Sequence, residues 1–387
     1  METVAVIYGG RSAEHDVSIV TALASIIKPL ELSKKYRIEA IYIAKDGAWY
    51  WDEKLKDITL FTSGKIQDFL QHAHPVSVQL DGGMTLVKSS GIAGRKQLKK
   101  IDIVFPAMHG TYGEDGALMG LLDMAGVAYV GCGVSASAVA MDKVLAKELA
   151  VANDIPVSKF LKFTKADLER EPAAALKSIK AALKFPLFVK PAHLGSSIGI
   201  SRVTDDTTLA NALEVAAHYD DLVLVEEAVQ NLVEVTLPIM GLASNPQPAL
   251  LEEPMTKPED FFDFDTKYMQ GGKKGKSGAK GAQGYSQIPA KLPKDLYDKA
   301  EATGLSVYKA FGCSGIARVD LLIDVKTKSV YFNEVNPLPG GLYQHNWALA
   351  GISKVELAQK LIGYAKERHT QRQALATVFN TNYLQQF

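Results

Sequence analysis

Residues 315–340 read GIARVDLLIDVKTKSVYFNEVNPLPG and carry the clearest chemical signal in the chain. Their apolar runs predict two neighbouring strands, over residues 318–323 and 329–333. Because successive side chains of a strand point to opposite faces, Arg318 and Asp320 lie on the same face. This pair of strands therefore predicts a surface on which a cation stands beside a carboxylate.

Two more oxygen donors follow at the end of the second strand. Glu334 and Asn336 are again two residues apart, so they also share one face. Carboxylate and amide oxygens are the ligands that Mg²⁺ prefers, and Mg²⁺ commonly completes its coordination shell with phosphate oxygens and water. Together with Arg318 and Asp320 they predict a site for a metal-bound triphosphate. The plainer alternative is a set of exposed strand ends joined by ordinary salt bridges.

The size and charge of the chain limit the classes of function. At 387 residues the chain is too long for one compact core and suits two or three packed domains. Apolar residues make up 47% of it and charged residues 22%, the usual balance of a soluble globular protein. Acidic and basic side chains number 43 each, so no net charge draws the chain to nucleic acid or to an anionic membrane.

The cysteines and the N-terminus indicate a cytoplasmic protein. Cys132 and Cys313 are the only cysteines, too few for a disulfide framework or a four-cysteine zinc site. The first residues lack the basic region, the long apolar core and the cleavage site of a signal peptide. No apolar run approaches the roughly 18 to 20 residues that span a bilayer. We therefore expect a cytoplasmic location and no membrane partner.

Changes in the texture of the sequence predict the domain organisation. In residues 1–139, short apolar runs alternate with glycine-rich turns and helical patterns, which predicts a parallel sheet covered by helices on both faces. Residues 45–100 are less regular and are interpreted as an elaboration of this domain. Residues 140–228 and 229–368 each predict further strands and helices, and residues 369–387 read as a polar, loosely held tail.

A second candidate site for phosphate lies in the middle of the chain. Lys190 ends a predicted strand and is followed by the turn Gly195-Ser196-Ser197-Ile198-Gly199. An ammonium group and several backbone N–H groups can bind phosphate, and glycine lets the backbone come close. The alternative is a solvated hairpin loop. Lys143 is a candidate for another phosphate cation, although a lone lysine is usually a surface residue.

Two more segments suggest ligand binding. Residues 225–229, Val-Glu-Glu-Ala-Val, end a predicted strand, where apolar side chains can sandwich a purine while backbone groups read its edge. The carboxylate of Glu234 can accept hydrogen bonds from ribose hydroxyls, although a single acidic residue is usually just solvated. Residues 109–116 contain three glycines, which indicates backbone packed closely against a ligand or a neighbouring domain. Within them His109 is a candidate general base, with a structural histidine as the alternative.

Two apparent nucleotide motifs do not meet their own requirements. Residues 271–277 resemble a P-loop, but three residues separate the glycines where four are needed, and no strand precedes them. We interpret residues 260–287 as a mobile basic loop, with a nucleic-acid contact as a weaker alternative. Residues 131–136 approach a dinucleotide fingerprint but lie far from the N-terminal strand, so we expect no nicotinamide cofactor.

Taken together, these segments resemble the D-alanine–D-alanine ligases, which have the ATP-grasp fold. The resemblance runs from Val4 to about residue 368. It implies an α/β protein with an N-terminal parallel-sheet, Rossmann-like domain of the pre-ATP-grasp type, followed by two ATP-grasp subdomains and a lid loop at about 260–287. The segments that carry it are residues 9–14, 109–116, 141–143, 190–199, 265–268, 315–320 and 333–340.

The resemblance implies a role for each matching residue. The residues expected to bind ATP are Lys143, Lys190, Ser197, Glu226, Glu227, Ala228, Val229, Glu234 and Lys267. Those expected to hold two Mg²⁺ ions, with Mn²⁺ able to replace them, are Asp320, Glu334 and Asn336. Those expected to serve catalysis are Glu14, Ser196, Tyr268, Arg318 and Gly340. Those expected to lie at the two amino-acid substrates are His109 and His345.

The resemblance also implies a reaction with ATP and D-alanine as substrates. The carboxylate of the first D-alanine attacks the γ-phosphate of ATP to give an acyl-phosphate, and the amine of the second then attacks the activated carbonyl. Arg318 and the backbone N–H of Gly340 form the oxyanion hole, while Glu14 binds the first ammonium group, linked to Ser196 and Tyr268. The product serves peptidoglycan precursor synthesis. We expect a homodimer with no nucleic-acid partner.

The chain departs from the family's pattern after Gly340. The family usually continues with Phe-Thr and a serine that helps to hold the second substrate's carboxylate, whereas residues 341–347 read GLYQHNW and place His345 there. A histidine can supply an N–H group or a positive charge, but D-lactate or another amino acid stays open as the second substrate. Tyr268, which the lactate-using relatives lack, favours the dipeptide. A nucleotide-binding regulator without turnover is a further alternative, and the intact set of Arg318, Asp320, Glu334 and Asn336 argues against it.

Overall fold

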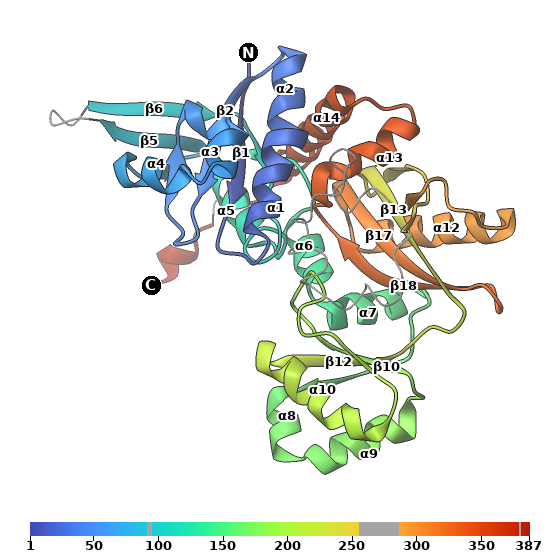
Figure 1. Ribbon diagram of the computed structural model, residues 1–387. Helices are drawn as coiled ribbons and strands as arrows, with labels where there is room; N and C mark the ends of the chain where they lie inside the picture. Colours follow the sequence, from blue (N-terminus) through green and yellow to red (C-terminus); the bar gives the residue numbers. More distant parts are fainter. Residues whose placement is uncertain (91–94, 255–285, 379–380) are drawn as a thin grey trace.

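A mainly parallel sheet near the N-terminus forms the first layer of the computed structural model (Figure 1). The structure describes residues 1–90, 95–254, 286–378 and 381–387. The strands of this sheet, in the order β3-β2-β1-β7-β8, are β1 (Thr3–Gly9), β2 (Arg37–Ile43), β3 (Trp49–Trp51), β7 (Ile103–Pro106) and β8 (Ala128–Tyr129). Only β3 pairs antiparallel, with β2, so the predicted parallel sheet is confirmed.

Helices cover both faces of this sheet, as the sequence predicts. Alternate residues of β1 belong to different apolar clusters, one with Val6 and one with Ile7. The Val6 cluster contains Ile26 from a continuous helical run, and the Ile7 cluster contains Leu122 from a helix on the other face. The helices are α1 (His15–Val20), the π-helical η1 (Thr21–Ile27), α2 (Lys28–Ser33) and, on the other face, α5 (Ala117–Ala125).

The elaboration expected at residues 45–100 consists of short helices and a small second sheet. The helical segments are η2 (Glu53–Lys56), α3 (Ile58–Thr62) and α4 (Ile66–His72). The antiparallel strands are β4 (Ser77–Leu80), β5 (Met84–Ser90) and β6 (Arg95–Ile101). In Figure 1, β5 and β6 extend from the body of the molecule as a narrow arm.

A four-stranded antiparallel sheet occupies the middle of the chain, in the order β11-β10-β12-β9. Its strands are β9 (Phe160–Thr164), β10 (Leu187–Pro191), β11 (Ser201–Val203) and β12 (Leu222–Glu227). The helices around it are α6 (Val134–Met141), α7 (Lys143–Ala152), α8 (Lys165–Arg170), α9 (Pro172–Ala182) and α10 (Asp206–Tyr219). Val189 and Val225 pack with Ile179 of α9, whereas Leu224, on the opposite face, packs with Val144 of α7.

The C-terminal part contains a further antiparallel sheet, in the order β14-β13-β17-β18. Its strands are β13 (Leu232–Leu242), β14 (Asn245–Pro248), β17 (Ser314–Asp324) and β18 (Ser329–Asn336). Helix α12 (Lys294–Ala310) covers one face, where Val307 joins a core cluster with Val319 and Leu321. The short strands β15 (Glu253–Pro254) and β16 (Ser286–Gln287) pair with each other, so the last two residues of the expected loop 260–287 form a strand.

The last helices return to the N-terminal sheet. They are η5 (Gly340–Tyr343), α13 (Gln344–Leu349), α14 (Lys354–Gln373) and η6 (Tyr383–Gln386). Trp347 and Leu361 belong to the same core cluster as Val6 of β1. Helix α14 runs past the start of the tail expected at residue 369, and Arg372 in its last turn forms an ion pair with Asp123. The first residues of the expected tail are therefore helical and anchored.

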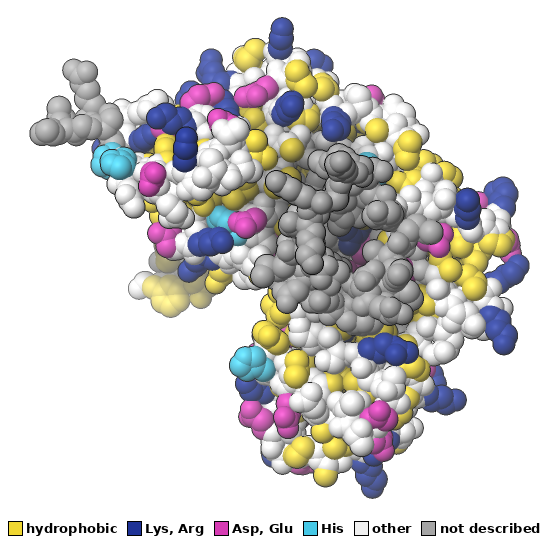
Figure 2. Space-filling model, viewed as in Figure 1, with side chains coloured by type: hydrophobic (Ala, Val, Ile, Leu, Met, Phe, Trp, Pro, Cys, Tyr) yellow, Lys and Arg dark blue, Asp and Glu magenta, His cyan; other side chains and the backbone are white. Residues whose placement is uncertain are grey.

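The surface mixes both signs of charge. In Figure 2 the lysine and arginine side chains outside the grey residues are scattered over the visible face among acidic ones. Among the described residues on this face, the basic side chains therefore do not gather into a single patch. Among the described residues, no helix is long and apolar enough to span a membrane.

Candidate active site

Strands β17 and β18 bring four polar side chains together in two cross-strand pairs. In the antiparallel register Arg318 lies opposite Asn336, and Asp320 lies opposite Glu334. All four residues are half-buried, whereas Val319 between the first two is fully buried on the α12 side. The sheet thus presents one cation and three oxygen donors on one face, as the alternation along the strands predicts.

Arg318 and Asp320 form a bidentate ion pair. Arg318 Nε donates to Asp320 Oδ1 over 2.6 Å and Nη2 donates to Oδ2 over 2.5 Å, while Nη2 lies 4.0 Å from Glu334 Oε1. Burial raises the pKa of Asp320 to about 6, and the nearby Arg318 only partly opposes this. One guanidinium therefore faces two carboxylates, and the pair of strands carries a surplus of negative charge.

The turn after β18 holds Arg318 from the other side. Arg318 Nη1 donates to Tyr343 Oη over 3.4 Å, and its guanidinium carbon lies 5.3 Å from the centre of the Tyr343 ring. Gly341, Leu342 and Tyr343 are all left-handed, with φ of 60°, 54° and 50°. Such a conformation costs roughly 1–3 kcal/mol for each residue other than glycine, and strain of this kind is often found at ligand sites.

Gly340 precedes this turn and has open space beside it. A Cβ atom added at Gly340 would meet no atom within 4 Å in the described part of the chain. The next residue, Gly341, donates its N–H to Thr21 Oγ1 over 3.1 Å, which ties the turn to the N-terminal helices. The turn is therefore fixed at Gly341, and no described atom fills the place of a side chain at Gly340.

Two lysines lie across from the strand pair. Lys190, on β10, forms an ion pair with Glu226 of the neighbouring strand β12, and Lys143, the first residue of α7, donates to the carbonyl of Leu194. Burial lowers the pKa of Lys143. Burial also opposes the charge of Lys190, but the carboxylates around it, above all Glu226, together raise its pKa. The charge of Glu334 favours the protonated form of both lysines. Glu334 of the strand pair therefore lies within electrostatic range of both lysines.

The serine turn after β10 is bent sharply back on itself. Ser196 and Ser197 have φ of 54° and 60°, in the left-handed region that non-glycine residues rarely adopt. Gly199 has φ of 72°, and a Cβ there would lie 2.7 Å from Pro191 Cγ. The turn therefore combines backbone strain with close packing against the end of β10.

Glu14 links this turn to the N-terminal domain. It stands at the N-cap of α1, and its carboxylate accepts a hydrogen bond from Ser196 Oγ. Burial, followed by the charge of Glu114, raises the pKa of Glu14. A Cβ added at Gly110 would lie 2.6 Å from Ser12 Oγ and 3.1 Å from Glu14 Oε2. The glycine at position 110 therefore leaves the room that the carboxylate occupies.

His109 reaches the site through a neighbour. The residue is 3% exposed, its Nε2 lies 2.9 Å from Thr21 Oγ1, and its Nδ1 lies 3.7 Å from Glu114 Oε1. Thr21 Oγ1 also accepts the N–H of Gly341. Through Thr21, the buried side chain of His109 therefore connects the N-terminal helices with the turn after β18.

Some of the hydrogen-bonding groups in the segment expected to bind adenine, residues 226–229, are already bonded within the fold. The backbone N–H of Glu227 donates to Lys159 O and that of Ala228 to Pro186 O, each over 2.9 Å. The carboxylate of Glu226 points into a buried cluster with two lysines, and that of Glu227 accepts the backbone N–H of Lys184 over 2.9 Å. Recognition of a base at residues 226–229 would thus use the remaining backbone groups. Glu234, on β13, contributes to the charge around Lys190.

His345 is held by a buried carboxylate. Its Nε2 lies 2.9 Å from Glu252 Oε2, which also accepts from Asn346 Nδ2 over 3.2 Å. The centre of the His345 ring lies 5.0 Å from the centre of the Tyr343 ring. Because Tyr343 also contacts Arg318, it connects His345 to Arg318. Its Nδ1 is buried and has no hydrogen-bond partner within the residues described. A buried polar atom of this kind is suited to a ligand.

A second histidine supports the lysine side of the site. His193 Nδ1 lies 2.9 Å from Asp220 Oδ1, and its Nε2 lies 3.4 Å from Asp142 Oδ2. Asp142 caps α7 directly before Lys143, so His193 connects this helix start to the end of α10. Hydrogen bonds to Asp142 and Asp220 raise the pKa of His193 to about 10.

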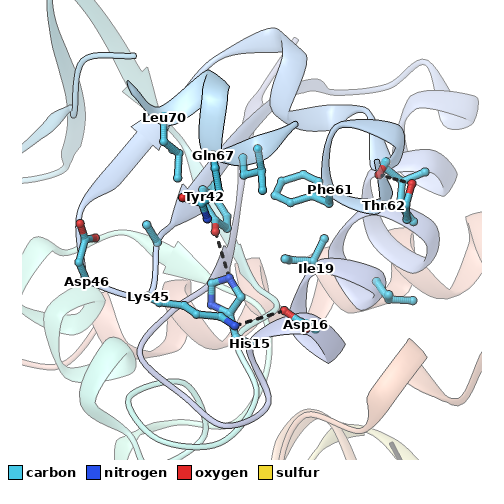
Figure 3. A pocket seen from close by; sticks show the side chains of 14 residues that line it. His15, Asp16, Ile19, Tyr42, Lys45, Asp46, Phe61, Thr62, Gln67 and Leu70 are labelled. Carbon is cyan, nitrogen blue, oxygen red and sulfur yellow. Dashed lines mark hydrogen bonds and ion pairs between the residues drawn. The ribbon is translucent and has the colours of Figure 1, made fainter. Parts of the chain in front are cut away.

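A pocket elsewhere in the N-terminal domain does not coincide with these groups. It has a volume of about 560 Å³ and is lined only by residues between His15 and Leu70 (Figure 3). His15 and Tyr42 are joined by a hydrogen bond of 3.0 Å in its wall, and Phe61 and Leu70 add apolar surface. The candidate active site is therefore defined by converging charges and not by this cavity.

Two predicted site residues, Lys267 and Tyr268, lie outside the described residues, as does most of the loop at 260–287. Sequence reasoning also missed several residues that the site uses. These are Thr21, Lys147, Glu252 and Tyr343. Only Lys147 had a local signal, because it follows Lys143 by four residues and so lies on the same side of α7.

Solved structures with the same architecture are ligases of the ATP-grasp fold. The D-alanine-D-alanine ligase from Coxiella burnetii superposes with a TM-score of 0.76 at 28% identity, covering 96% of this chain and 97% of that one. The VanG D-Ala:D-Ser ligase from Enterococcus faecalis superposes with a TM-score of 0.75 at 32% identity, covering 94% and 99%. The fold and the converging charges thus define an ATP-grasp ligase.

The sequence comparisons identify the family. The profile described as "D-ala D-ala ligase N-terminus" matches residues 3–132, and that described as "D-ala D-ala ligase C-terminus" matches residues 149–363. A D-alanine--D-alanine ligase from Chloroherpeton thalassium is 35% identical over 376 residues, covering 95% of this chain and 97% of that protein. One from Acetivibrio thermocellus is 36% identical over 380 residues, covering 95% and 96%. The chain belongs to the D-alanine–D-alanine ligase family.

Proposed function

We propose that this protein joins two D-alanines to D-alanyl-D-alanine, with cleavage of ATP to ADP and phosphate, for the synthesis of peptidoglycan precursors. One observation carries the proposal beyond family membership. The cross-strand set of Arg318, Asp320, Glu334 and Asn336 is intact on one face of a sheet, and the charge of Glu334 acts on both Lys143 and Lys190. These are the charges that a bound triphosphate and its reaction require.

The chemistry proceeds in two steps. A carboxylate is a poor electrophile, so the first D-alanine attacks the γ-phosphate of ATP and becomes an acyl-phosphate, with ADP as the leaving group. The amine of the second D-alanine then attacks the acyl carbon, and inorganic phosphate leaves. Lys143 and Lys190 balance the negative charge of the phosphates during the first step. Glu14 binds the ammonium group of the first D-alanine, supported by its hydrogen bond from Ser196.

The donor set suits magnesium. Asp320, Glu334 and Asn336 offer carboxylate and amide oxygens, and Asn336 Oδ1 accepts the N–H of Leu338 over 3.2 Å, which fixes that side chain. These residues would hold Mg²⁺, or Mn²⁺, for which the same hard oxygens serve. The cation would supply charge neutralisation at the phosphate oxygens. The ion pair with Arg318 fixes the orientation of the Asp320 carboxylate.

Arg318 and the N–H of Gly340 stabilise the oxyanion that forms when the amine attacks. Asp320 and Tyr343 fix the guanidinium in advance, and no described atom lies within 4 Å of a Cβ atom added at Gly340. Removal of one donor from such a site commonly costs roughly 3–4 kcal/mol in the barrier. We expect the backbone at residues 226–229, with Ser197, Glu234 and Lys267, to complete the ATP site, and Tyr268 to support Glu14.

His345 is proposed to hold the carboxylate of the second substrate. Its position next to Tyr343, and the anchoring of its Nε2 by Glu252, support this assignment. His109 is proposed to lie near the carboxylate of the first D-alanine, through its contact with Thr21.

A direct assay tests the proposed function. Purified protein is mixed with ATP, Mg²⁺ and D-alanine, phosphate release is followed, and the dipeptide is identified by mass spectrometry. We expect D-alanine alone to sustain release, and L-alanine, as the control, to give none. If phosphate release requires D-serine or D-lactate in addition, that compound and not D-alanine is the second substrate. Nucleotide binding without release under any of these conditions would leave only a regulatory protein.

We further propose that the enzyme acts in the cytoplasm, where ATP is supplied, and that it is a homodimer. Both cysteines are free and buried, as expected for a chain that folds without disulfides. Light scattering after size exclusion tests the oligomeric state. A mass of about 84 kDa, twice the chain mass of 41.9 kDa, is the expected result, and a mass near one chain would contradict it.

A further inference from the structure

A buried cluster of charges lies behind the ATP-facing lysine. Lys147 of α7, Lys190 of β10 and Glu226 of β12 converge there, and their side chains are 1%, 13% and 2% exposed. Lys147 follows Lys143 by one helical turn, but the proposed reaction assigns no task to it. A fully buried lysine is rare unless it is paired, so its presence calls for a physical reason.

Both oxygens of Glu226 are occupied. Lys190 pairs with Oε1, and Lys147 pairs with Oε2 over 2.7 Å. Ser158 Oγ also donates to Oε2 over 2.7 Å and accepts from Lys147 Nζ over 3.1 Å. The carboxylate therefore has a fixed orientation. Lys190 binds Oε1 on the side of the proposed ATP site, and Lys147 binds Oε2 behind it.

The charges of this cluster do not balance. Two ammonium groups share one carboxylate, which leaves one positive charge inside the protein. The lysines hold the pKa of Glu226 well below its usual range in spite of burial, so the carboxylate is ionised. Of the two cations, Lys190 is the more exposed, whereas Lys147 is enclosed, and the charge of Glu334 acts on both. The surplus charge therefore belongs to the side that borders the proposed ATP site.

We propose that Lys147 is a positioning residue for the nucleotide, which shares the neutralisation of Glu226 so that Lys190 keeps part of its positive charge for the phosphates of ATP. In its absence Glu226 would neutralise Lys190 instead, and the cluster would offer the phosphates no net charge. The inference rests on the proposed binding of ATP at this sheet, but it assigns a role to a residue outside the set that carries the proposed function.

A purely structural role for Lys147 predicts a different outcome. Removal of one partner of a buried ion pair destabilises a fold strongly, because the other charge is left buried without its partner. A structural lysine would therefore affect folding, or all ligands equally. A lysine that sets the charge of Lys190 affects ligands according to the phosphates that they carry.

The test is calorimetric binding of ADP and of adenosine, without Mg²⁺, to the full-length parent protein and three variants. Lys147→Met removes the positive charge of Lys147 and keeps much of the side-chain volume. Lys147→Met combined with Glu226→Gln restores the single positive charge on Lys190. Lys162→Met is the matched control, because the Lys162 side chain is 52% exposed on β9 and its ion pair among the described residues is with the surface residue Glu148. Thermal unfolding of each variant confirms that it is folded.

We expect Lys147→Met to weaken ADP binding by about tenfold to a hundredfold, the range for losing a charge-assisted contact, and to leave adenosine binding unchanged. The double variant is expected to recover most of the ADP affinity, and Lys162→Met to match the parent. Equal losses for ADP and adenosine, or no recovery in the double variant, would overturn the proposal. Failure of the parent to bind ADP would overturn the proposed function as well, whereas ADP binding without D-alanine ligation would overturn the proposed function alone.

Discussion

The two antiparallel sheets that border the candidate active site carry opposite surpluses of charge. On the C-terminal sheet, Arg318 stands against the carboxylates of Asp320 and Glu334, which leaves a negative surplus. On the central sheet, Lys147 and Lys190 share Glu226, which leaves a positive surplus. A metal cation suits the first surface and the phosphates of a nucleotide suit the second. The difference supports the proposal that neither sheet alone makes the site, and that a metal–nucleotide complex binds between them.

The largest effect is expected from the loss of Arg318, the cation on the C-terminal sheet. We call this sheet, with its surplus of carboxylates, the negative sheet, and the central sheet the positive sheet. We expect Arg318→Ala to lower kcat by at least about 100- to 1,000-fold, since an oxyanion donor is lost. Binding of ADP should survive in part, because the central sheet keeps its charges. Steady-state phosphate release and ADP calorimetry measure the two quantities. Unchanged kcat would exclude Arg318 from the oxyanion hole.

The next largest effect is expected from the loss of Lys190 on the positive sheet. Lys190→Met is expected to raise the KM for ATP by about 100-fold, because a charged hydrogen-bond donor to phosphate is lost and Glu226 keeps only Lys147 as its partner. The KM for D-alanine should change little. An equal rise in both KM values would show that the substitution disturbs the fold and not the phosphate contact.

A smaller effect distinguishes the two amino-acid sites. His345→Ala is expected to raise the KM for the second D-alanine by about tenfold, because one charged or N–H contact to its carboxylate is lost, and to leave the first site unchanged. The reason is the separation between His345, held by Glu252, and Glu14, held by Ser196. Kinetics at low and high D-alanine separate the two constants. Equal effects on both would make His345 a structural residue.

The smallest expected effect concerns the support of the positive sheet. The pKa of His193 is raised from its ordinary value of 6.5 to about 10, so its ion pairs stabilise the fold fully below pH 6.5 and are lost as the pH rises through about 10. Because the side chain is partly exposed, we expect His193→Gln to lower Tm by only about 1–3 °C at pH 7. Near pH 10.5 the difference from the parent should nearly vanish. A difference independent of pH would refute this role.

The negative sheet was largely predictable, because the rule that shapes it is local. Alternation along a strand places Arg318 with Asp320, and Glu334 with Asn336, whatever the rest of the chain does. The register that sets Asp320 opposite Glu334 depends on the bulge after Asp320, which no residue pattern announces. The sequence therefore indicates the donor set but not its pairing.

The positive sheet and the turn after β18 were harder to predict. Lys147 reads as an ordinary helix residue until β12 brings Glu226 beside it from 79 positions further along the chain. Leu342 and Tyr343 adopt left-handed conformations that side chains of their type disfavour, so the turn that fixes Arg318 has no sequence signature. The polar residues after 368 read as a loose tail because their anchor, the ion pair of Arg372 with Asp123, comes from a distant helix.

The most direct test of the shared site is the effect of Mg²⁺ on ADP binding in the parent and in Asp320→Asn, measured by titration calorimetry. If the two sheets bind one metal–nucleotide complex, Mg²⁺ should tighten ADP binding to the parent by about tenfold or more, and Asp320→Asn should lose most of this gain while binding metal-free ADP at least as well. An equal gain from Mg²⁺ in both proteins would show that Asp320 does not face the nucleotide, and the account of the site would be wrong.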